Sequence, residues 1–417
     1  MREGYIQTTL QEVCSKTSNI KWQDYLNKTF EYIDLSSVSR ESLIITETTP
    51  INSVTAPSRA KQIIFENDVI FATTRPTLKR VTLVTSPYHN QICSTGFCVL
   101  RANKILIEAK LIKYFIQSES FMNRMQSLER GASYPAVSDK DVFEATLIIP
   151  KSLQEQKQIV AILDQAFKAI DQAKANIEKN IANAKELFQS KLNAIFSQKG
   201  DGWEEKSLGE IADVNYGYTD KSTSEGDFRY VRITDIDNNG ELDKTGKVYI
   251  KSTPEALNFI LKENDLLMAR TGATFAKVLL YKDYEPSIFA SYLIKISFKV
   301  NIINELYLYF TKSGYYWEQA NNLSSGSAQP HFNGAALKKV IFSYPLDSSE
   351  QQRLIEIIKG FDNTKKEIIS LYLQKLHSLE ELKKSILQKA FTGELTNKEE
   401  TEPLQQVAEP TTSYSKN

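Results

Sequence analysis

The stretch "ENDLLMARTGATFAKV" at residues 263–278 repeats, with a changed ending, the stretch "ENDVIFATTRPTLKRV" at residues 66–81. The match extends in both directions. Upstream, "GYIQTTLQEV" near the start of the chain matches "GWEEKSLGEI" near its middle, and downstream "EQKQIVAIL" from Glu155 matches "EQQRLIEII" from Glu350. Matching positions lie about 195 to 198 residues apart, which is far longer than the period of a solenoid repeat. The chain is therefore a tandem duplication of one domain-sized unit.

The composition indicates a globular protein of two or three domains, because the chain has 417 residues, of which 41% are hydrophobic. No apolar run approaches the length of a membrane span, and the start lacks the apolar core of a signal peptide. Three cysteines indicate thiols in a reducing compartment rather than a disulfide framework. We therefore expect a cytoplasmic protein.

The charge balance neither supports nor excludes nucleic acid as a partner. Lys and Arg number 51, and Asp and Glu also number 51, so the net charge is zero. Dedicated nucleic-acid binders are more often basic overall. A neutral chain can still bind DNA if its basic residues are segregated on one face or if basic partners share the contact.

Two long amphipathic helices are the clearest predicted elements. From about residue 152 to 196, apolar residues recur at steps of three and four without Gly or Pro. The 42 positions from Glu155 to Phe196 correspond to roughly 60 Å at about 1.5 Å per residue. The second copy repeats the pattern from Ser349, a candidate N-cap, to a stop at Gly393. Their matched lengths favour burial of the two apolar stripes against each other, although an ordinary core helix is the alternative.

The segments between these helices predict a mixed α+β domain in each copy. Short β-rich runs such as "QIIFENDVIFATT" and "SYLIKISFKV" alternate with helical stretches such as "EAKLIKYFIQSESFMNRMQSL". The last segment is polar, contains Pro and lacks periodicity, so we expect a disordered tail. The predicted organisation is a first domain at 1–150, a helix at 151–200, a second domain at 201–348, a helix at 349–396 and a tail at 397–417.

No catalytic constellation is evident in the sequence. There is no glycine-rich phosphate loop and no dinucleotide fingerprint. His89, Cys93 and Cys98 lie close together, but a structural zinc site needs about four ligands and the second copy has no counterpart, so we interpret these cysteines as strand residues. Only three histidines are present, which leaves little for acid–base chemistry. The sequence therefore favours a binding protein, with no metal and no catalytic residue of its own.

Several segments together resemble the specificity (S) subunit of type I restriction–modification systems. "EQKQIVAILD" and "EQQRLIEII" each open a long helix after a Pro-containing strand, and "LEELKKSILQKAFTGEL" from Leu379 is similar to the close of that family's distal helix. "KSLGEIADVNYG" from Lys206, "ENDLLMARTG" from Glu263 and "SSGSAQPHF" from Ser324 look like parts of a target recognition domain. The resemblance covers about residues 4–396. The first domain departs from the pattern with "TTLQEV" and "TTRPTLKRV", as expected if the two halves read different sequences.

The resemblance implies a non-catalytic DNA-recognition subunit. Each of the two target recognition domains would read one half of an asymmetric, bipartite site in double-stranded DNA, and the two helices would pair as an antiparallel coiled coil that measures the spacer. The helices would dock two modification (methyltransferase) subunits, which bring S-adenosylmethionine and methylate adenine, and two restriction (translocase–nuclease) subunits would join. We take as candidate partner-binding residues the helix positions Ile159, Ile162, Phe188, Leu354, Ile357 and Leu382.

The candidate DNA-binding residues are polar, basic and aromatic side chains in loops that follow predicted strands. Base reading uses Arg or Lys on guanine and Asn or Gln on adenine, whereas backbone contacts set the register. In the first domain the candidates are Thr74, Arg75, Lys79, Arg80, Ser133 and Tyr134. In the second domain they are Tyr216, Tyr218, Thr219, Lys221, Arg270, Thr271, Lys277, Ser327, Gln329 and His331. The alternatives are a solvated loop for the residues near Tyr218 and a structural ion pair for Arg270.

Two other functions compete with this interpretation. A scaffold or ligand-binding protein with duplicated domains would present an acidic or apolar face instead of a basic one. An enzyme with its own cleavage or methylation site would act without any added subunit, but the sequence offers no motif for it.

Overall fold

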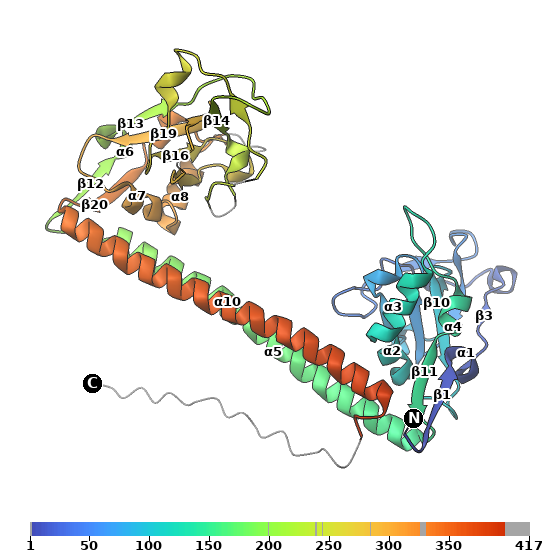
Figure 1. Ribbon diagram of the computed structural model, residues 1–417. Coiled ribbons are helices and arrows are strands. Elements are labelled where there is room, and N and C mark those ends of the chain that lie inside the picture. Colours follow the sequence, from blue (N-terminus) through green and yellow to red (C-terminus); the bar gives the residue numbers. More distant parts are fainter. Residues whose placement is uncertain are drawn as a thin grey trace, which may run out of the picture. The chain divides into compact units, whose positions relative to one another are not determined.

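The computed structural model forms two compact units (Figure 1). The first contains residues 1–176 and 375–417, and the second contains residues 177–374. The structure describes residues 2–198, 200–237, 240–243, 245–283, 285–325 and 331–396. The predicted tail at 397–417 lies outside these residues. Each unit thus combines one mixed α/β domain with a part of each long helix.

The strands of the first unit form three sheets. Strand β1 (Tyr5–Thr9) pairs antiparallel with β11 (Thr146–Pro150). The other strands are β2 (Cys14–Ser15), β3 (Ser18–Asn19), β4 (Phe30–Ile33), β5 (Thr49–Ile51), β6 (Ala60–Ile64), β7 (Asp68–Ala72), β8 (Val81–Leu83), β9 (Gln91–Ser94) and β10 (Phe97–Ala102). They form a four-stranded sheet in the order β2-β10-β7-β8 and a five-stranded sheet in the order β3-β6-β9-β4-β5.

The second unit repeats this arrangement with one shorter sheet. Strand β12 (Trp203–Ser207) pairs antiparallel with β20 (Ile341–Pro345). The other strands are β13 (Ala212–Tyr216), β14 (Phe228–Val231), β15 (Tyr249–Ile250), β16 (Leu266–Ala269), β17 (Val278–Leu280), β18 (Ser287–Phe289) and β19 (Leu293–Phe298). Their sheet orders are β13-β19-β16-β17 and β15-β14-β18. In both units one parallel pair, β4 with β9 and β14 with β18, sits in an otherwise antiparallel sheet.

Short helices connect and cover these strands. In the first unit they are α1 (Leu10–Val13), α2 (Ala109–Gln117), α3 (Glu119–Leu128) and α4 (Asp139–Phe143), with 3₁₀ turns η1 (Trp22–Tyr25), η2 (Pro76–Leu78) and η3 (Ser86–Tyr88). In the second they are α6 (Leu208–Ile211), α7 (Asn304–Phe310), α8 (Gly314–Leu323) and α9 (Gly334–Leu337), with η4 (Ile233–Asp235), η5 (Ala256–Phe259) and η6 (Gly272–Thr274). Helix α2 packs on β7 and β8, and α7 packs on β17.

The expected helical stretch after β10 is divided at one residue. Helix α2 ends at Gln117, and Ser118 then caps α3 by accepting a hydrogen bond from the backbone N–H of Phe121 at 3.3 Å. Ser313 caps α8 in the same way through the N–H of Tyr316 at 3.2 Å. A capping serine at matched positions thus turns the chain between two short helices in both copies.

The long helices α5 (Leu153–Phe196) and α10 (Ser348–Thr392) lie side by side and antiparallel, as predicted (Figure 1). In the first unit the Lys383 ammonium lies 4.6 Å from the ring centroid of Phe167. In the second unit the Lys365 ammonium lies 3.8 Å from the ring centroid of Phe188. Gly393, with a φ of +82°, follows the end of α10.

A buried glutamine attaches each long helix to its domain. Gln156 is fully buried, and its amide donates to the carbonyls of Leu106 at 2.9 Å and Pro150 at 2.8 Å, while its oxygen accepts from the N–H of Glu108 at 2.9 Å. Its counterpart Gln351 makes the same three bonds, at 2.8 to 2.9 Å, to the backbone of residues 301, 303 and 345. This contact explains why "EQ" opens both helices.

The ends of the long helices are also core helices of their domains, so both interpretations of the apolar stripes hold over different parts of the same helix. Ile159 and Leu163 on α5, with Leu387 and Phe391 on α10, belong to the core of the first unit. In the second unit, Phe188 and Leu192 on α5 join Leu354 and Ile358 on α10 in the core.

Candidate nucleic-acid interface

In the first domain, two loops bring four of the predicted residues together. Thr74 forms an isolated β-bridge with Ala136, and the N–H of Arg75 donates to the carbonyl of Pro135 at 2.7 Å. The turn after β7 therefore lies against the hairpin at residues 130–136. The Arg75 guanidinium lies 4.8 Å from the ring centroid of Tyr134, and its Nη2 donates to the Ser133 carbonyl at 3.4 Å. Tyr134 is 70% exposed, so this pair is on the surface.

The backbone around Arg75 adopts an unusual conformation. Arg75 has a φ of +50° and Lys79 a φ of +54°, both in the left-handed region that costs a non-glycine residue about 1–2 kcal/mol. The matching positions in the second domain are Gly272, with φ +80°, and Ala276, with φ +60°. Strained residues of this kind cluster at functional sites. Both side chains of the first domain, Arg75 and Lys79, are exposed.

Arg80 does not join this cluster. Its Nη1 donates to the carbonyl of Leu35, so the guanidinium is held inside the domain. Its Nε is buried without a hydrogen-bond partner among the residues that the structure describes. The basic group predicted from adjacent residues in the sequence is therefore reduced to Arg75 and Lys79 on the surface.

In the second domain, Arg270 lies among aromatic rings rather than in an ion pair. Its guanidinium is 4.8 Å from the ring centroid of Tyr216 and 5.8 Å from that of Tyr292, and its Nη1 donates to the carbonyl of Ser291 at 3.1 Å. Tyr216 is fixed in turn, because its hydroxyl accepts from the N–H of Gly334 at 2.9 Å. The structural ion pair considered for Arg270 is thus not present among the described residues.

Tyr292 was not anticipated from the sequence. It is 56% exposed and lies just before β19, where the pairing of β16 with β19 brings it next to Arg270. The backbone N–H of Arg270 donates to the Tyr292 carbonyl at 3.1 Å. An exposed tyrosine at the start of a strand was the available signal, but its partner could be recognised only once the strand order was known.

The loop after β13 is divided between packed and exposed residues. Tyr218 packs inward, with its ring centroid 5.4 Å from that of Phe259 and its hydroxyl 3.3 Å from the Thr253 hydroxyl. Thr219 and Lys221 are exposed. Thr219 and Lys221 are therefore on the surface, whereas Tyr218 packs within the domain.

The other predicted residues of the second domain have different surroundings. Thr271 is buried. Lys277 is half-buried directly before β17, and its carbonyl accepts from the N–H of Ala269 at 2.9 Å. His331 is exposed and forms a β-bridge with Ser325. Ser327 and Gln329 lie outside the described residues.

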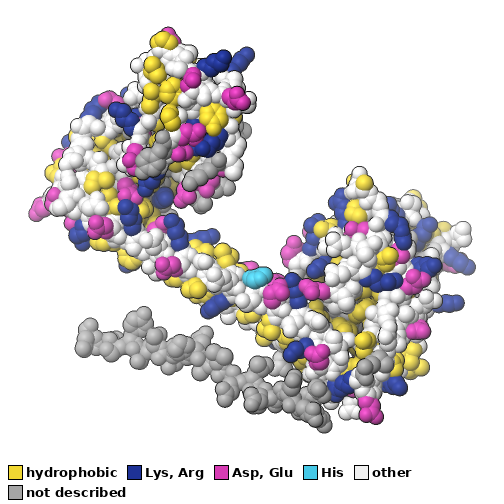
Figure 2. All heavy atoms as spheres, viewed as in Figure 1, with side chains coloured by type: hydrophobic (Ala, Val, Ile, Leu, Met, Phe, Trp, Pro, Cys, Tyr) yellow, Lys and Arg dark blue, Asp and Glu magenta, His cyan; other side chains and the backbone are white. Residues whose placement is uncertain are grey.

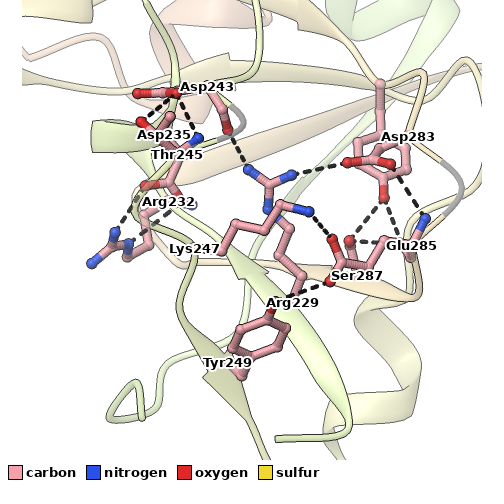
Figure 3. Close-up of polar contacts among 11 residues, drawn as sticks. Arg229, Arg232, Asp235, Asp243, Thr245, Lys247, Tyr249, Asp283, Glu285 and Ser287 are labelled. Atoms are coloured by element: carbon pink, nitrogen blue, oxygen red, sulfur yellow. Dashed lines mark hydrogen bonds and ion pairs between the residues drawn. The ribbon is translucent and has the colours of Figure 1, made fainter. Parts of the chain in front are cut away.

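A polar network fixes the loops on one side of the second domain (Figure 3). The Arg229 side chain is completely buried, and its Nη1 pairs with an Asp283 carboxylate oxygen at 2.9 Å while its Nη2 donates to the Asp243 carbonyl at 2.5 Å. Lys247 pairs with Glu285 at 2.5 Å beside it. These contacts join β14 to the loops before β15 and β18, so the network has a structural role.

The candidate partner-binding positions are only partly accessible. Ile159 and Leu354 are buried in the domain cores, and Phe188 is covered by the Lys365 ammonium, so these three predicted side chains pack within the chain. Ile162, Ile357 and Leu382 are exposed. These three remain available for a partner.

The visible surface carries mixed charge (Figure 2). On the face shown, Lys and Arg side chains are scattered among Asp and Glu side chains over each domain, in agreement with the zero net charge. The described residues contain no cluster of metal-ligating side chains. None of the described helices combines the length and apolarity needed to cross a membrane.

The chain is similar to solved structures over almost its whole length. One is a chain from a study described as the structural basis underlying complex assembly and conformational transition of the type I R-M system, with 25% identity, a TM-score of 0.83 and coverage of 95% of this chain and 99% of that one. Another is the HsdS subunit from Thermoanaerobacter tengcongensis, with 26% identity, a TM-score of 0.65 and coverage of 95% and 98%. A comparison with curated protein sequences found no match.

The family comparison agrees with the internal repeat. The family model described as the type I restriction modification DNA specificity domain matches twice, at residues 3–183 and 200–378. Each match contains one complete domain and most of the long helix that follows it. With both copies matched over most of the chain, the protein belongs to the type I restriction–modification DNA specificity family.

Proposed function

We propose that this chain is the subunit that selects the DNA site in a type I restriction–modification complex, with each domain reading one half of a bipartite, asymmetric sequence. The observation that carries the proposal is that the two domains share one strand order, which we call the frame, but carry different side chains on their surfaces. The strand order β2-β10-β7-β8 is repeated as β13-β19-β16-β17, yet the surface side chains beside β7 and β16 differ. A duplicated frame with unlike surface residues suits two unlike half-sites.

The paired helices α5 and α10 set the length of the unread spacer in this proposal and dock the other subunits. Exposed Ile162, Ile357 and Leu382 are apolar positions through which two modification subunits could pack on the helices. Those subunits would supply S-adenosylmethionine and methylate adenine, and two restriction subunits would complete the complex. The chain itself performs no catalysis in this scheme.

The zero net charge of the chain supports a DNA interface that is shared with the modification subunits. Phosphate contacts by Lys and Arg supply most of the non-specific affinity for DNA. This chain is neutral, and its basic side chains are interspersed with acidic ones on the face shown in Figure 2. The isolated chain should therefore bind DNA weakly, and the modification subunits should supply much of the phosphate neutralisation.

The decisive experiment maps DNA methylation. The chain is produced with its neighbouring modification subunit in a host that lacks both, and modified adenines are located across the genome. A single bipartite motif with a fixed gap is the expected result. If the two proteins co-purify and are folded but no motif appears, the chain does not select the methylation site.

The same assay tests the role of the helices. One helical turn is inserted in register into both α5 and α10. We expect a longer gap with both half-sites unchanged, because one turn adds about 5.4 Å to the helix pair. An unchanged gap in a folded complex would contradict the spacer role.

A further inference from the structure

Arg270, Tyr216 and Tyr292 form a surface site that exists only in the second domain. The strand pairing establishes the matching positions in the first domain. Ala269 pairs with Leu293 as Ala72 pairs with Phe97. The next backbone bond, from the N–H of residue 270 to the carbonyl of residue 292, corresponds to the bond from residue 73 to residue 96 at 2.9 Å.

The first domain therefore has Thr73 in place of Arg270 and Gly96 in place of Tyr292. The Thr73 hydroxyl is buried and donates to the Gly96 carbonyl at 3.0 Å, so the first domain has a short, internally bonded side chain here. Its own exposed arginine is Arg75, two residues further along the chain. The two domains thus present an arginine beside tyrosine at different positions of the same frame.

The Arg270 guanidinium is held in a fixed position with unused hydrogen-bonding capacity. Nη1 is bound to the Ser291 carbonyl, and Nε is buried without a partner among the described residues. No hydrogen bond from Nη2 and no carboxylate partner for the charge occur within the described part of the chain. A half-buried cation without a counter-ion favours a ligand that offers hydrogen-bond acceptors.

The two tyrosines limit the motion of the Arg270 side chain but do not neutralise its charge. Arg stacks on aromatic faces and keeps its planar fork of donors, so a stacked guanidinium loses less conformational entropy when it binds. Tyr216 is held at both ends: its hydroxyl accepts from the N–H of Gly334 at 2.9 Å, and the backbone at the next residue, Gly217, passes so close to Ala290 that a Cβ there would lie 2.3 Å from the Ala290 carbonyl oxygen. A rigid arginine suits recognition of one particular base edge more than a mobile contact with phosphate.

We infer that Arg270, held between Tyr216 and Tyr292, reads a guanine in the half-site of the second domain through its acceptor atoms O6 and N7. This inference rests on the proposed function and specifies the chemistry of one of its two sites. Arg on guanine is the commonest base-specific contact in the major groove, and a good bidentate pair contributes about 1–3 kcal/mol of discrimination. Tyr292 is a positioning residue that acts through Arg270.

The test is methylation mapping of the chain with its modification subunit, scored separately for each base pair of both half-sites. Arg270→Ala and Arg270→Lys should each reduce the preference for a G·C pair at one position of the second half-site by about tenfold or more, because lysine keeps the charge but not the fork. Tyr292→Leu should give a smaller loss at that same position. The first half-site and the gap should be unchanged in all three variants.

The control variant is Lys262→Ala, which also removes one positive charge and lies before the opposite end of β16. It should leave the motif unchanged. Uniformly weaker methylation of all sites in Arg270→Ala, with recovery in Arg270→Lys, would identify a phosphate contact and overturn the inference. An unaltered motif in both Arg270 variants would overturn it as well. If the unmodified chain gave no bipartite motif, the proposed function itself would have failed.

Discussion

The two domains have the same order of strands and helices but different surface side chains beside β7 and β16. The "EQ" glutamines, the capping serines of α3 and α8 and the parallel strand pairs occur at matched positions. In contrast, the first domain places Arg75 beside Tyr134 on two loops, whereas the second places Arg270 between two tyrosines at strand ends. A frame that tolerates such changes beside one edge of a sheet can acquire a new surface without refolding. Substitutions at matched positions can separate residues that stabilise the shared fold from residues that serve only the surface.

The largest expected effect concerns the buried guanidinium of Arg229 in the second domain, whose matching residue in the first domain is not an arginine. Arg229→Met removes a completely buried guanidinium and, with it, the ion pair to Asp283 and the hydrogen bond to the Asp243 carbonyl. We expect a loss of stability on the order of 3 kcal/mol, because removal of one partner of a buried ion pair is strongly destabilising. Urea denaturation measures this loss.

The matched substitution in the first domain is Glu31→Met, since "FEYI" in β4 corresponds to "FRYV" in β14. The Glu31 side chain is only half-buried and accepts from the Thr48 hydroxyl at 2.5 Å. Its replacement should cost about 1 kcal/mol. Equal losses for the two variants would contradict the view that Arg229 contributes more to the stability of the second domain than Glu31 contributes to that of the first.

The glutamine clamps should behave alike in the two domains. Gln156→Leu and Gln351→Leu each remove three hydrogen bonds to the backbone, one buried and two partly buried, so each should destabilise its domain by about 2 kcal/mol. Gln158→Leu, at an exposed position of α5, is the control and should have little effect. A large difference between the two clamp variants would show that the clamps are not equivalent.

Cysteine labelling can show whether a substitution exposes the interior of the first domain. The chain has only three cysteines, and all lie in the first domain. Burial, with the nearby Asp68 carboxylate, raises the pKa of Cys14 to about 12, and burial also raises the pKa of Cys93 and of Cys98. The folded chain should therefore react slowly with maleimide at pH 8. Gln156→Leu should accelerate labelling, and Gln351→Leu should not.

Much of the frame could be predicted from the sequence, and the reason is physical. The helix expected from about residue 152 to 196 is observed as Leu153–Phe196, because a long stripe with clear stop signals leaves few alternatives. The surroundings of the candidate DNA-binding residues were harder to predict. Arg80 follows Lys79 in the sequence but turns inward just before β8, and Tyr292 meets Arg270 only through the pairing of β16 with β19. Contacts that depend on long-range strand order have no local signal.

The stability lost to the left-handed backbone conformation of Arg75 in the first domain can be measured directly. Arg75 occupies a left-handed position where the second domain has Gly272. Arg75→Gly relieves this backbone strain, but glycine also increases the conformational entropy of the unfolded chain, which favours unfolding. The free energy of unfolding should therefore be unchanged or rise by up to about 1 kcal/mol. The same variant should weaken selection at the first half-site only, as read by methylation mapping. A clear loss of stability would indicate that Arg75 is a structural residue.

The smallest expected effect concerns the hairpin that carries Tyr134. Arg130 begins this hairpin and pairs with Asp141 on α4 at 2.8 Å, whereas the matching residues of the second domain, Ser325 and Ala336, cannot form an ion pair. Hydrogen bonds from Arg130 and then Ser138 hold the pKa of Asp141 well below its usual range. The ionised carboxylate therefore stabilises the fold at neutral pH, and this contribution is lost as the pH falls below the ordinary value of about 4.

Asp141→Asn should cost less than about 1 kcal/mol at pH 7, because Arg130 is largely exposed, and the difference from the unmodified chain should shrink on acidification. Ala336→Ser, at the matching position of the second domain, is the control and should show no such pH dependence. Since the hairpin holds Tyr134 over Arg75, Asp141→Asn should also relax base preference slightly at the first half-site and leave the second unchanged. An effect on both half-sites would contradict the proposal that each domain reads its own half-site independently, because Asp141 belongs to the first domain alone.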